Sequence, residues 1–350
     1  MLTAQDFRGL YAIIPTPAKP GAERLDATDT VDLAESERVV NALIDDGING
    51  LIVLGTTGEC ATLSQADYEL FVTCVLETVD RRIPTFIGTS ALGGHEVARR
   101  LRFIRERGAD GSLLGLPMWQ PVVDEEAVEF YRQVSEYFPD ISIMVYANSR
   151  AFRYPFPEDF WRQISREAPT VCAAKHSRPA HLTELIAASQ GRINFMPHEM
   201  SVHEFYGLSP ETTTACWATS AAMGPAPARA IIDAILEKNG AGIVTHTWRG
   251  RRSRGDGVLQ HPTGKNPHKR LRLLPIWADA PALRLHARQF PRNRRGMRPP
   301  LGETLRNLSG RLPVQRPGVA GRRVIGLQYK NHIVILALDA RIFCPTGLHR

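Results

Sequence analysis

The chain has 350 residues, of which 43% are hydrophobic and 23% charged, values typical of a globular protein. No run approaches the ~20 apolar residues of a membrane span, and residues 1–11 lack the pattern of a signal peptide. The five cysteines show neither a CxxC motif nor metal-ligand spacing. We therefore expect a cytoplasmic protein with reduced thiols, no membrane segment and no metal site.

Charge divides the chain into two parts. Residues 240–350 contain 22 Lys+Arg and 4 Asp+Glu, a net charge of +18, so the preceding part has a net charge of −11 and the chain +7. Such an asymmetry predicts either a nucleic-acid-binding tail or a segment of different origin.

Eight short apolar runs before residue 240 predict strands that are buried on both faces. They cover 10–15, 50–55, 84–89, 111–117, 142–147, 171–176, 193–198 and 214–219. Helical stripes lie between them: 64–79, where Ser64 and Asp67 resemble a capping box, 97–104 with a stop at Gly108, 128–138, 182–186 and 231–236.

This alternation of strands and helices predicts an α/β protein with a parallel sheet. Eight units in about 240 residues favour a TIM (β/α)₈ barrel over 1–240. An open doubly wound sheet is the alternative, although no GxGxxG follows the first strand. Residues 241–350 form an irregular basic C-terminal segment, rich in Arg, Pro and Gly, for which we expect disorder except for a strand at 332–338.

Two polar side chains end neighbouring predicted strands. Lys175 follows the run VCAA, where burial would lower its pKa and leave a neutral amine that can attack a carbonyl. Tyr146 ends the preceding strand, and its phenol could relay protons during carbinolamine formation. Taken alone, such a lysine is more often a rim or salt-bridged residue, and such a tyrosine a core residue.

The pentapeptide Gly55-Thr56-Thr57-Gly58-Glu59 follows the second predicted strand. Its glycines permit close approach of a ligand, and its hydroxyl and N–H groups can hold a carboxylate. It lacks the GK[ST] element of a phosphate loop, and as a bare pentapeptide it could be an ordinary turn.

In this order and spacing, these features resemble the dihydrodipicolinate synthase / N-acetylneuraminate lyase superfamily of class I pyruvate aldolases, over residues 1–240. Within it, the chain is similar to the hydratase-aldolases of aromatic hydrocarbon degradation that act on trans-2'-carboxybenzalpyruvate or trans-o-hydroxybenzylidenepyruvate. The matching pieces are TTGECATL (56–63), PMW (117–119), YAN (146–148), AAK (173–175), MPHE (196–199) and ACW (215–217).

The resemblance implies a role for each matched residue. Lys175 would form a Schiff base with a small-molecule 2-keto acid, without any other cofactor or metal. Tyr146, linked to Thr57, would carry protons, and Asn148 would position the water. Substrate binding would fall to Gly55, Thr56 and Thr57 at the pyruvyl carboxylate, and to Trp217, Trp119, Gln120 and His176 at the aryl group.

The ring substituent is a separate hypothesis. An ortho-carboxylate would favour a cation near the aryl site, and His176, Arg178, His198 and Arg150 are candidates by position. On this ground the expected substrate is trans-2'-carboxybenzalpyruvate. Two other functions stay open: a dihydrodipicolinate synthase-like lyase or synthase, and an inactive barrel whose basic tail binds nucleic acid.

The chain departs from the family after the last predicted helix. Family members continue with a helical extension that lines the site, and nothing after residue 240 resembles it. Our hypothesis is that the reading frame shifts near residue 240. The homotetramer that the resemblance implies, and the activity of this chain, depend on that point.

Overall fold

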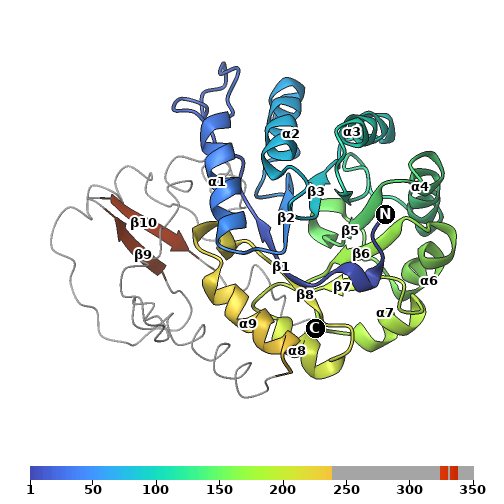
Figure 1. Ribbon diagram of the computed structural model, residues 1–350. Helices are drawn as coiled ribbons and strands as arrows, with labels where there is room; N and C mark the ends of the chain where they lie inside the picture. The colour runs from blue at the N-terminus through green and yellow to red at the C-terminus, as the bar shows by residue number, and fades with distance from the viewer. Residues whose placement is uncertain (239–323, 330–331, 338–350) are drawn as a thin grey trace, which may run out of the picture. The chain divides into compact units, whose positions relative to one another are not determined.

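The computed structural model describes residues 1–238, 324–329 and 332–337 (Figure 1). In the first of these ranges, eight parallel strands are hydrogen-bonded in the order β8-β1-β2-β3-β4-β5-β6-β7. Their bounds are β1 Gly9–Ile13, β2 Gly50–Val53, β3 Thr85–Gly88, β4 Gly111–Leu114, β5 Ser142–Tyr146, β6 Val171–Lys175, β7 Asn194–Met196 and β8 Ala215–Ala218. Each of the eight predicted strands is therefore confirmed.

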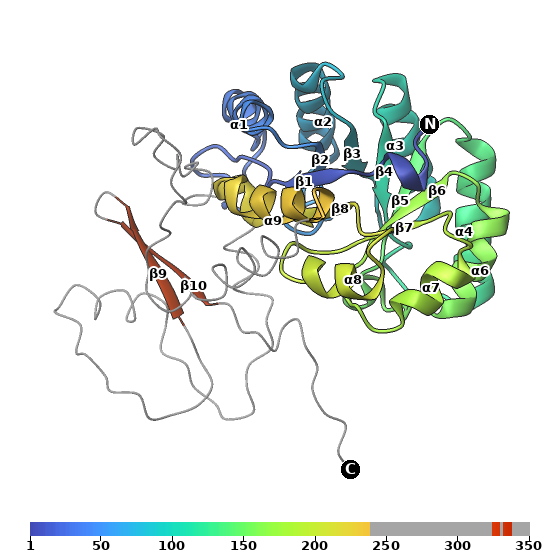
Figure 2. The same ribbon diagram turned by 60° about the horizontal axis from the view of Figure 1, so that its bottom comes forward.

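Helices surround this ring of strands, as both ribbon views show (Figures 1 and 2). They are α1 Leu33–Asp45, α2 Gln65–Val79, α3 Gly94–Glu106, α4 Asp124–Tyr137, α5 Ser149–Phe152, α6 Glu158–Glu167, α7 Leu182–Ala188, α8 Val202–Leu208 and α9 Ala226–Leu236, with 3₁₀ turns η1 Ala4–Asp6 and η2 Ser220–Met223. This arrangement confirms the predicted TIM barrel and excludes the open doubly wound sheet.

The start of α2 shows how local sequence sets a helix boundary. Ser64 is the N-cap, and its hydroxyl accepts the N–H of Asp67. The second half of the expected capping box is different, because the Asp67 carboxylate accepts the N–H and hydroxyl of Thr30 instead of the N-cap N–H. The acidic residue thus ties the β1–α1 connection to α2.

The barrel interior is filled by large side chains that point inward from the strands. Tyr11 and Phe86 are almost fully buried and stack edge-on with ring centroids 6.4 Å apart. Phe7 packs on both rings from the N-terminal side. Gly50 and Gly111 make room for this layer, since an added Cβ would lie 2.3 Å from the Tyr11 ring and 2.4 Å from the Phe86 ring.

The barrel closes between β7 and β8 through very few backbone contacts. A single bridge pairs His198 with Trp217, beyond the end of β7. The Trp217 N–H donates to the Pro197 carbonyl at 2.9 Å, and the Glu199 N–H donates to the Trp217 carbonyl at 3.0 Å. By comparison, β1 and β8 share four register pairs. The pairing between β7 and β8 is therefore sparse.

The two strands described near the C-terminus belong to a different compact unit from the barrel. In it, β9 Val324–Tyr329 pairs antiparallel with β10 His332–Ala337. The strand predicted at 332–338 is confirmed as β10, and β9 was not predicted. The rest of the expected irregular segment at 241–350, together with the proposed frame shift, lies outside the described residues.

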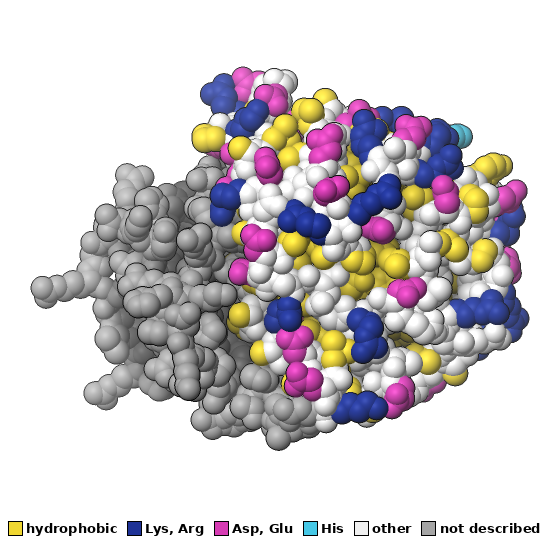
Figure 3. All heavy atoms as spheres, in the orientation of Figure 1, with side chains coloured by type: hydrophobic (Ala, Val, Ile, Leu, Met, Phe, Trp, Pro, Cys, Tyr) yellow, Lys and Arg dark blue, Asp and Glu magenta, His cyan; other side chains and the backbone are white. Residues whose placement is uncertain are grey.

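The described surface carries charges of both signs. Figure 3 shows Lys and Arg side chains interspersed with Asp and Glu over this face of the barrel, without a continuous basic patch. This face therefore gives no support to the nucleic-acid hypothesis, which was based on residues 241–350. Among the described residues, no helix is both long and apolar enough to cross a membrane.

Candidate active site

Lys175 is the last residue of β6, at the carboxyl end of the barrel strands where TIM-barrel sites lie. It pairs in register with Tyr146 at the end of β5 and with Met196 at the end of β7. Its Nζ lies 3.3 Å from the centroid of the Trp217 ring and 4.7 Å from that of Tyr146. Strands β5, β6 and β8 therefore bring the predicted lysine, tyrosine and tryptophan together.

The electrostatics around Lys175 favour a reactive amine. Burial lowers its pKa, and the charges of Tyr146 and Glu199 act in the opposite direction without cancelling this effect. A lowered pKa increases the fraction of neutral amine near neutral pH, which is the form that attacks a carbonyl. The two aromatic faces favour the charged form by cation–π attraction, so that a cation formed at this nitrogen is also accommodated.

Tyr146 is the centre of a short hydrogen-bond chain. Its hydroxyl lies 2.9 Å from Thr56 Oγ1 and accepts the Asn148 amide at 3.4 Å. Burial raises the pKa of Tyr146, but the positive charge of Lys175 and the bonds from Thr56 and Asn148 outweigh it, so the pKa is lowered. The sequence-based link from Tyr146 to Thr57 is thus corrected: Thr56 makes this bond, and Thr57 is the next residue along the loop.

The loop that presents Thr56 is tightly wound. Cys60 N–H donates to Gly55 O, and Thr16 Oγ1 donates to Gly58 O at 2.8 Å. Gly58 has no room for a side chain, because an added Cβ would lie 2.5 Å from Leu54 N. Glu59 ends the motif inside the protein, where burial raises its pKa to about 7.

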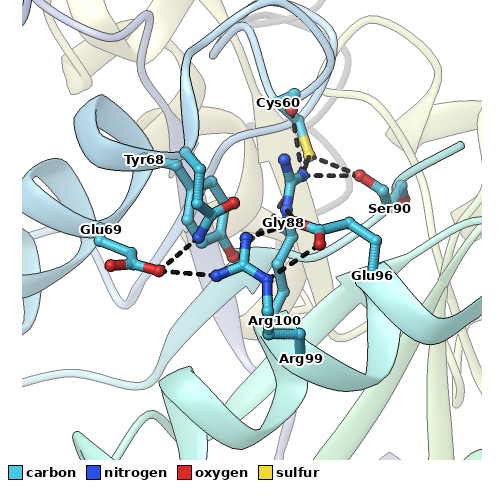
Figure 4. A network of polar contacts seen from close by, with 9 residues as sticks. Cys60, Tyr68, Glu69, Gly88, Ser90, Glu96, Arg99 and Arg100 are labelled. Atoms are coloured by element: carbon cyan, nitrogen blue, oxygen red, sulfur yellow. Dashed lines mark hydrogen bonds and ion pairs between the residues drawn. The ribbon is translucent and has the colours of Figure 1, made fainter.

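The buried guanidinium of Arg100, on helix α3, contacts the same loop (Figure 4). Arg100 Nη1 donates to the carbonyl oxygens of Cys60 at 3.1 Å and Ser90 at 2.9 Å, while Nε pairs with Glu96. The guanidinium also lies 4.4 Å from the centroid of the Tyr68 ring. Arg100 thereby joins the loops that follow β2 and β3. Burial raises the pKa of the Cys60 thiol to about 11, so this cysteine packs and donates rather than reacts.

Asn148 has two contacts of different kinds. Its side-chain oxygen accepts the N–H groups of Arg150 and Ala151 and thereby caps the short helix α5. Its amide group donates to Tyr146. The cap fixes the side chain's orientation, so the amide is held beside the phenol.

Trp217 forms the wall opposite Tyr146. It is 6% exposed, and its Nε1 donates to Met196 O at 3.1 Å. His198 packs edge-on against it, with ring centroids 4.3 Å apart. The indole orientation is therefore fixed by one hydrogen bond and one aromatic contact.

The remaining aryl-site candidates differ in their surroundings. Trp119 and Gln120 are exposed on the β4–α4 loop, and Trp119 is 71% exposed. His176, expected as a cation, points away from the Lys175 side and packs against Trp161 and Phe195. Burial lowers the pKa of His176 to about 4, so it is neutral and does not supply a charge to the substrate.

The other proposed cations differ in their surroundings. His198 Nε2 lies 2.8 Å from the Glu199 carboxylate. Arg178 is exposed in the β6–α7 connection, and Arg150 is exposed on α5. Among residues 1–238, no three His, Cys, Asp or Glu side chains are grouped so as to hold a metal ion.

Two residues with a part in this site received no role from the sequence. Glu199 belongs to the MPHE piece, and a carboxylate directly after the seventh predicted strand was a usable signal. Arg100 lies on the buried stripe of a helix that has a strongly polar sequence, and its position gave no sign of the loop contacts.

Comparison with known proteins places these residues in a family. A family model described as the dihydrodipicolinate synthetase family matches residues 16–151. The trans-O-hydroxybenzylidenepyruvate hydratase-aldolase of Pseudomonas putida is 40% identical over 241 residues, covering 69% of this chain and 72% of that protein. The trans-2'-carboxybenzalpyruvate hydratase-aldolase of Nocardioides sp. (strain KP7) is 35% identical over 241 residues, covering 67% and 72%.

Solved structures agree with the fold. A structure described as PhdJ bound to substrate intermediate matches with a TM-score of 0.69 and 34% identity, over 72% of this chain and 80% of that one. A dihydrodipicolinate synthase from Aquifex aeolicus matches with a TM-score of 0.63 and 20% identity, over 69% and 80%, and supports the fold alone. The predicted resemblance is confirmed: the chain belongs to the dihydrodipicolinate synthetase family and is related within it to the hydratase-aldolases.

Proposed function

We propose that the chain is a Schiff-base-forming hydratase-aldolase, a carbon–carbon lyase that converts an aryl-substituted benzylidenepyruvate and water to an aromatic aldehyde and pyruvate. The observation that carries the proposal is the Lys175 amine, which lies at a strand end between the rings of Tyr146 and Trp217 with a lowered pKa. Relatives named for this reaction, at 35–40% identity, support it.

The reaction begins at the keto group. The neutral amine of Lys175 adds to C2, and loss of water leaves an iminium that withdraws electrons from the conjugated alkene. Water then adds to the benzylic carbon, and a proton is taken up at C3. Cleavage of the C3–C4 bond releases the aromatic aldehyde and leaves the enamine of pyruvate. Protonation at C3 and hydrolysis of the iminium free pyruvate and restore the lysine.

The polar groups beside Lys175 divide this work. Tyr146, with its lowered pKa, takes and returns the protons of carbinolamine formation and breakdown. Thr56 holds the phenol, and the hydroxyl and N–H groups at Thr56 and Thr57 bind the pyruvyl carboxylate. The Asn148 amide, fixed by its cap contact, orients the attacking water. Trp217 is the apolar wall for the aryl ring.

The structure changes the argument about the ring substituent. His176 is neutral, and His198 faces the Glu199 carboxylate, so the carboxylated ring expected from the sequence keeps only Arg150 and Arg178 as candidate partners. An anion beside Trp217 disfavours an ortho-carboxylate there. The geometry therefore favours the ortho-hydroxy substrate over trans-2'-carboxybenzalpyruvate, and the ratio of the two specificity constants measures this preference.

Borohydride reduction in the presence of pyruvate tests the class of reaction. The full-length chain should gain one reduced pyruvyl adduct, located on Lys175 by peptide mass spectrometry. Lys175→Arg should abolish the adduct, while the matched surface control Lys19→Arg should retain it, because Lys19 pairs with Asp29 on the exposed β1–α1 connection. Folded protein without an adduct would contradict the proposal.

The acceptor is tested separately by aldehyde release. Aromatic aldehyde should appear from ortho-hydroxy and ortho-carboxy arylidenepyruvates, and pyruvate consumption with aspartate semialdehyde should be slow. The reverse preference would favour the synthase-like alternative within the same family.

A further inference from the structure

Glu199 is a buried carboxylate beside His198, and His198 packs against Trp217, the residue proposed to contact the aryl ring. It follows β7 and is 7% exposed. Ser220 Oγ donates to its Oε1 at 2.8 Å, and His198 Nε2 lies 2.8 Å from its Oε2. A carboxylate that is buried to this extent is costly unless it has partners. Its Oε1 accepts the hydrogen bond from Ser220, whereas Oε2 has the His198 ring beside it but no hydrogen bond.

His198 is oriented by contacts on both of its ring nitrogens. The N–H of Met200 donates to Nδ1 at 3.1 Å, so the neutral imidazole carries its proton on Nε2, facing Glu199. The ring then meets Trp217 at an interplanar angle of 73°. Glu199 thereby lies against a ring that in turn packs on the indole.

The same chain of contacts ends at the reactive nitrogen. Trp217 is held by His198 on one side and by its hydrogen bond to Met196 O. Its ring lies 3.3 Å from Lys175 Nζ. A displacement of His198 would therefore move the surface on which both the amine and an aryl group rest.

Charge gives Glu199 a second connection to Lys175. Among the described residues, the titratable groups that act on this amine are Tyr146 from β5 and Glu199 after β7, while β8 contributes only the neutral indole. An iminium keeps a positive charge at the same nitrogen, in a site where burial disfavours cations. A fixed anion at this depth stabilises that charge without reorganisation.

We propose that Glu199 is a positioning residue that fixes Trp217 through His198 and serves as the counter-charge for the cationic nitrogen of Lys175. The inference rests on the proposed function, since it explains how this site tolerates a buried iminium. It predicts that neutralising Glu199 destabilises the ammonium and the iminium together, because both cations occupy the same nitrogen.

Glu199→Gln in the full-length chain tests the charge role, with circular dichroism as the check on folding. The first measurement is the pH dependence of Lys175 acetylation by acetic anhydride, read by peptide mass spectrometry. Its midpoint should fall by about one pH unit, and at pH above both midpoints the pyruvate concentration for half-maximal borohydride trapping should rise roughly tenfold. Ser220→Ala, which leaves the charge in place, should keep the midpoint.

The positioning role has its own variant, which also serves if Glu199→Gln does not fold. His198→Gln keeps an amide donor for Glu199 but removes the ring that packs on Trp217. The half-saturating arylidenepyruvate concentration should rise several-fold, while the acetylation midpoint should fall by less than in Glu199→Gln, because the carboxylate charge stays in place. An unchanged acetylation midpoint in folded Glu199→Gln, or an unchanged half-saturating concentration of arylidenepyruvate in His198→Gln, would overturn the inference. The acetylation titration needs no substrate, so a failure of the proposed function, seen as no pyruvate adduct in the wild type, is distinguished from a failure of this inference.

Discussion

Substitution of Thr56 decides which threonine controls the catalytic phenol. In the structure Thr56 Oγ1 lies 2.9 Å from the Tyr146 hydroxyl and helps to lower its pKa. A hydrogen bond to a charged acceptor contributes about 1.5–3 kcal/mol, and the solvent exposure of Thr56 places this bond at the lower end. Since one pKa unit corresponds to about 1.4 kcal/mol, Thr56→Val should raise the pKa of Tyr146 by about one unit.

The assay is the pH profile of kcat for aldehyde release from an arylidenepyruvate. The limb that reports Tyr146 should move to higher pH by about one unit in Thr56→Val, and the rate near pH 7 should fall roughly tenfold if the phenolate acts as the base. Thr56→Ser retains the hydroxyl and should restore the limb. Thr57→Val should leave the limb in place and raise KM. If the limb moves in Thr57→Val and not in Thr56→Val, the reasoning from this hydrogen bond is refuted.

Further predictions concern stability and the buried polar groups. Arg100→Met should lower the free energy of unfolding by about 2–4 kcal/mol, because two buried carbonyls lose their donor, and thermal denaturation measures this; a loss below 1 kcal/mol (roughly the net value of one hydrogen bond) would contradict it. His176→Phe should keep the rate of aldehyde release and maintain or increase stability, since Nε2 is buried without a partner and the ring packs among aromatic residues; a large loss of rate would restore His176 to the site. Glu59 binds its proton more tightly when folded, with a pKa near 7 instead of 4.5, so the native state loses stability as pH rises from 4.5 through 7. Glu59→Gln should remove this dependence, worth about 3 kcal/mol at most, and a pH-stability profile that stays parallel to the wild type would contradict the assignment.

The sequence predicted the barrel strands well because each strand is buried on both faces. Such strands read as continuous apolar runs, and their predicted limits differ from those in the structure by at most three residues. Helices α1, α6 and α8 were not predicted individually. Helix α8 buries only Val202 and Phe205, too few for a periodic pattern, and α6 has a polar sequence around a few large buried side chains.

The site was predictable where a residue ends a strand and less so where it lies on a loop. Lys175 and Tyr146 end adjacent strands, so topology alone brings them together. Trp217 joins them because β8 meets the end of β7 where the barrel closes. The choice between Thr56 and Thr57 depends on the path of a tight loop, which no pattern of residue types encodes. Sequence patterns also do not reveal whether a side chain just past a strand end points into or out of the barrel. His176 is an example, because it was expected in the site but packs against Trp161 and Phe195.

The same problem concealed the role of Glu199. Its partners Ser220 and His198 come from different segments, and their contacts depend on how β7 and β8 meet. A sequence pattern shows that a carboxylate follows a strand. It does not show that this carboxylate faces an imidazole and a hydroxyl in the interior.

The sparse pairing between β7 and β8 has a consequence for how the aldehyde specificity of this enzyme can be changed. The bridge that closes the barrel pairs His198 with Trp217, so the residue proposed to contact the aryl ring also takes part in closing the fold. A smaller residue at Trp217 would admit bulkier aldehydes but would also loosen the only backbone contact of this kind within the described barrel. The exposed Trp119, on the β4–α4 loop, takes no part in this closing bridge. Libraries that aim at new aldehydes should therefore vary that loop first and alter Trp217 only in a stabilised background.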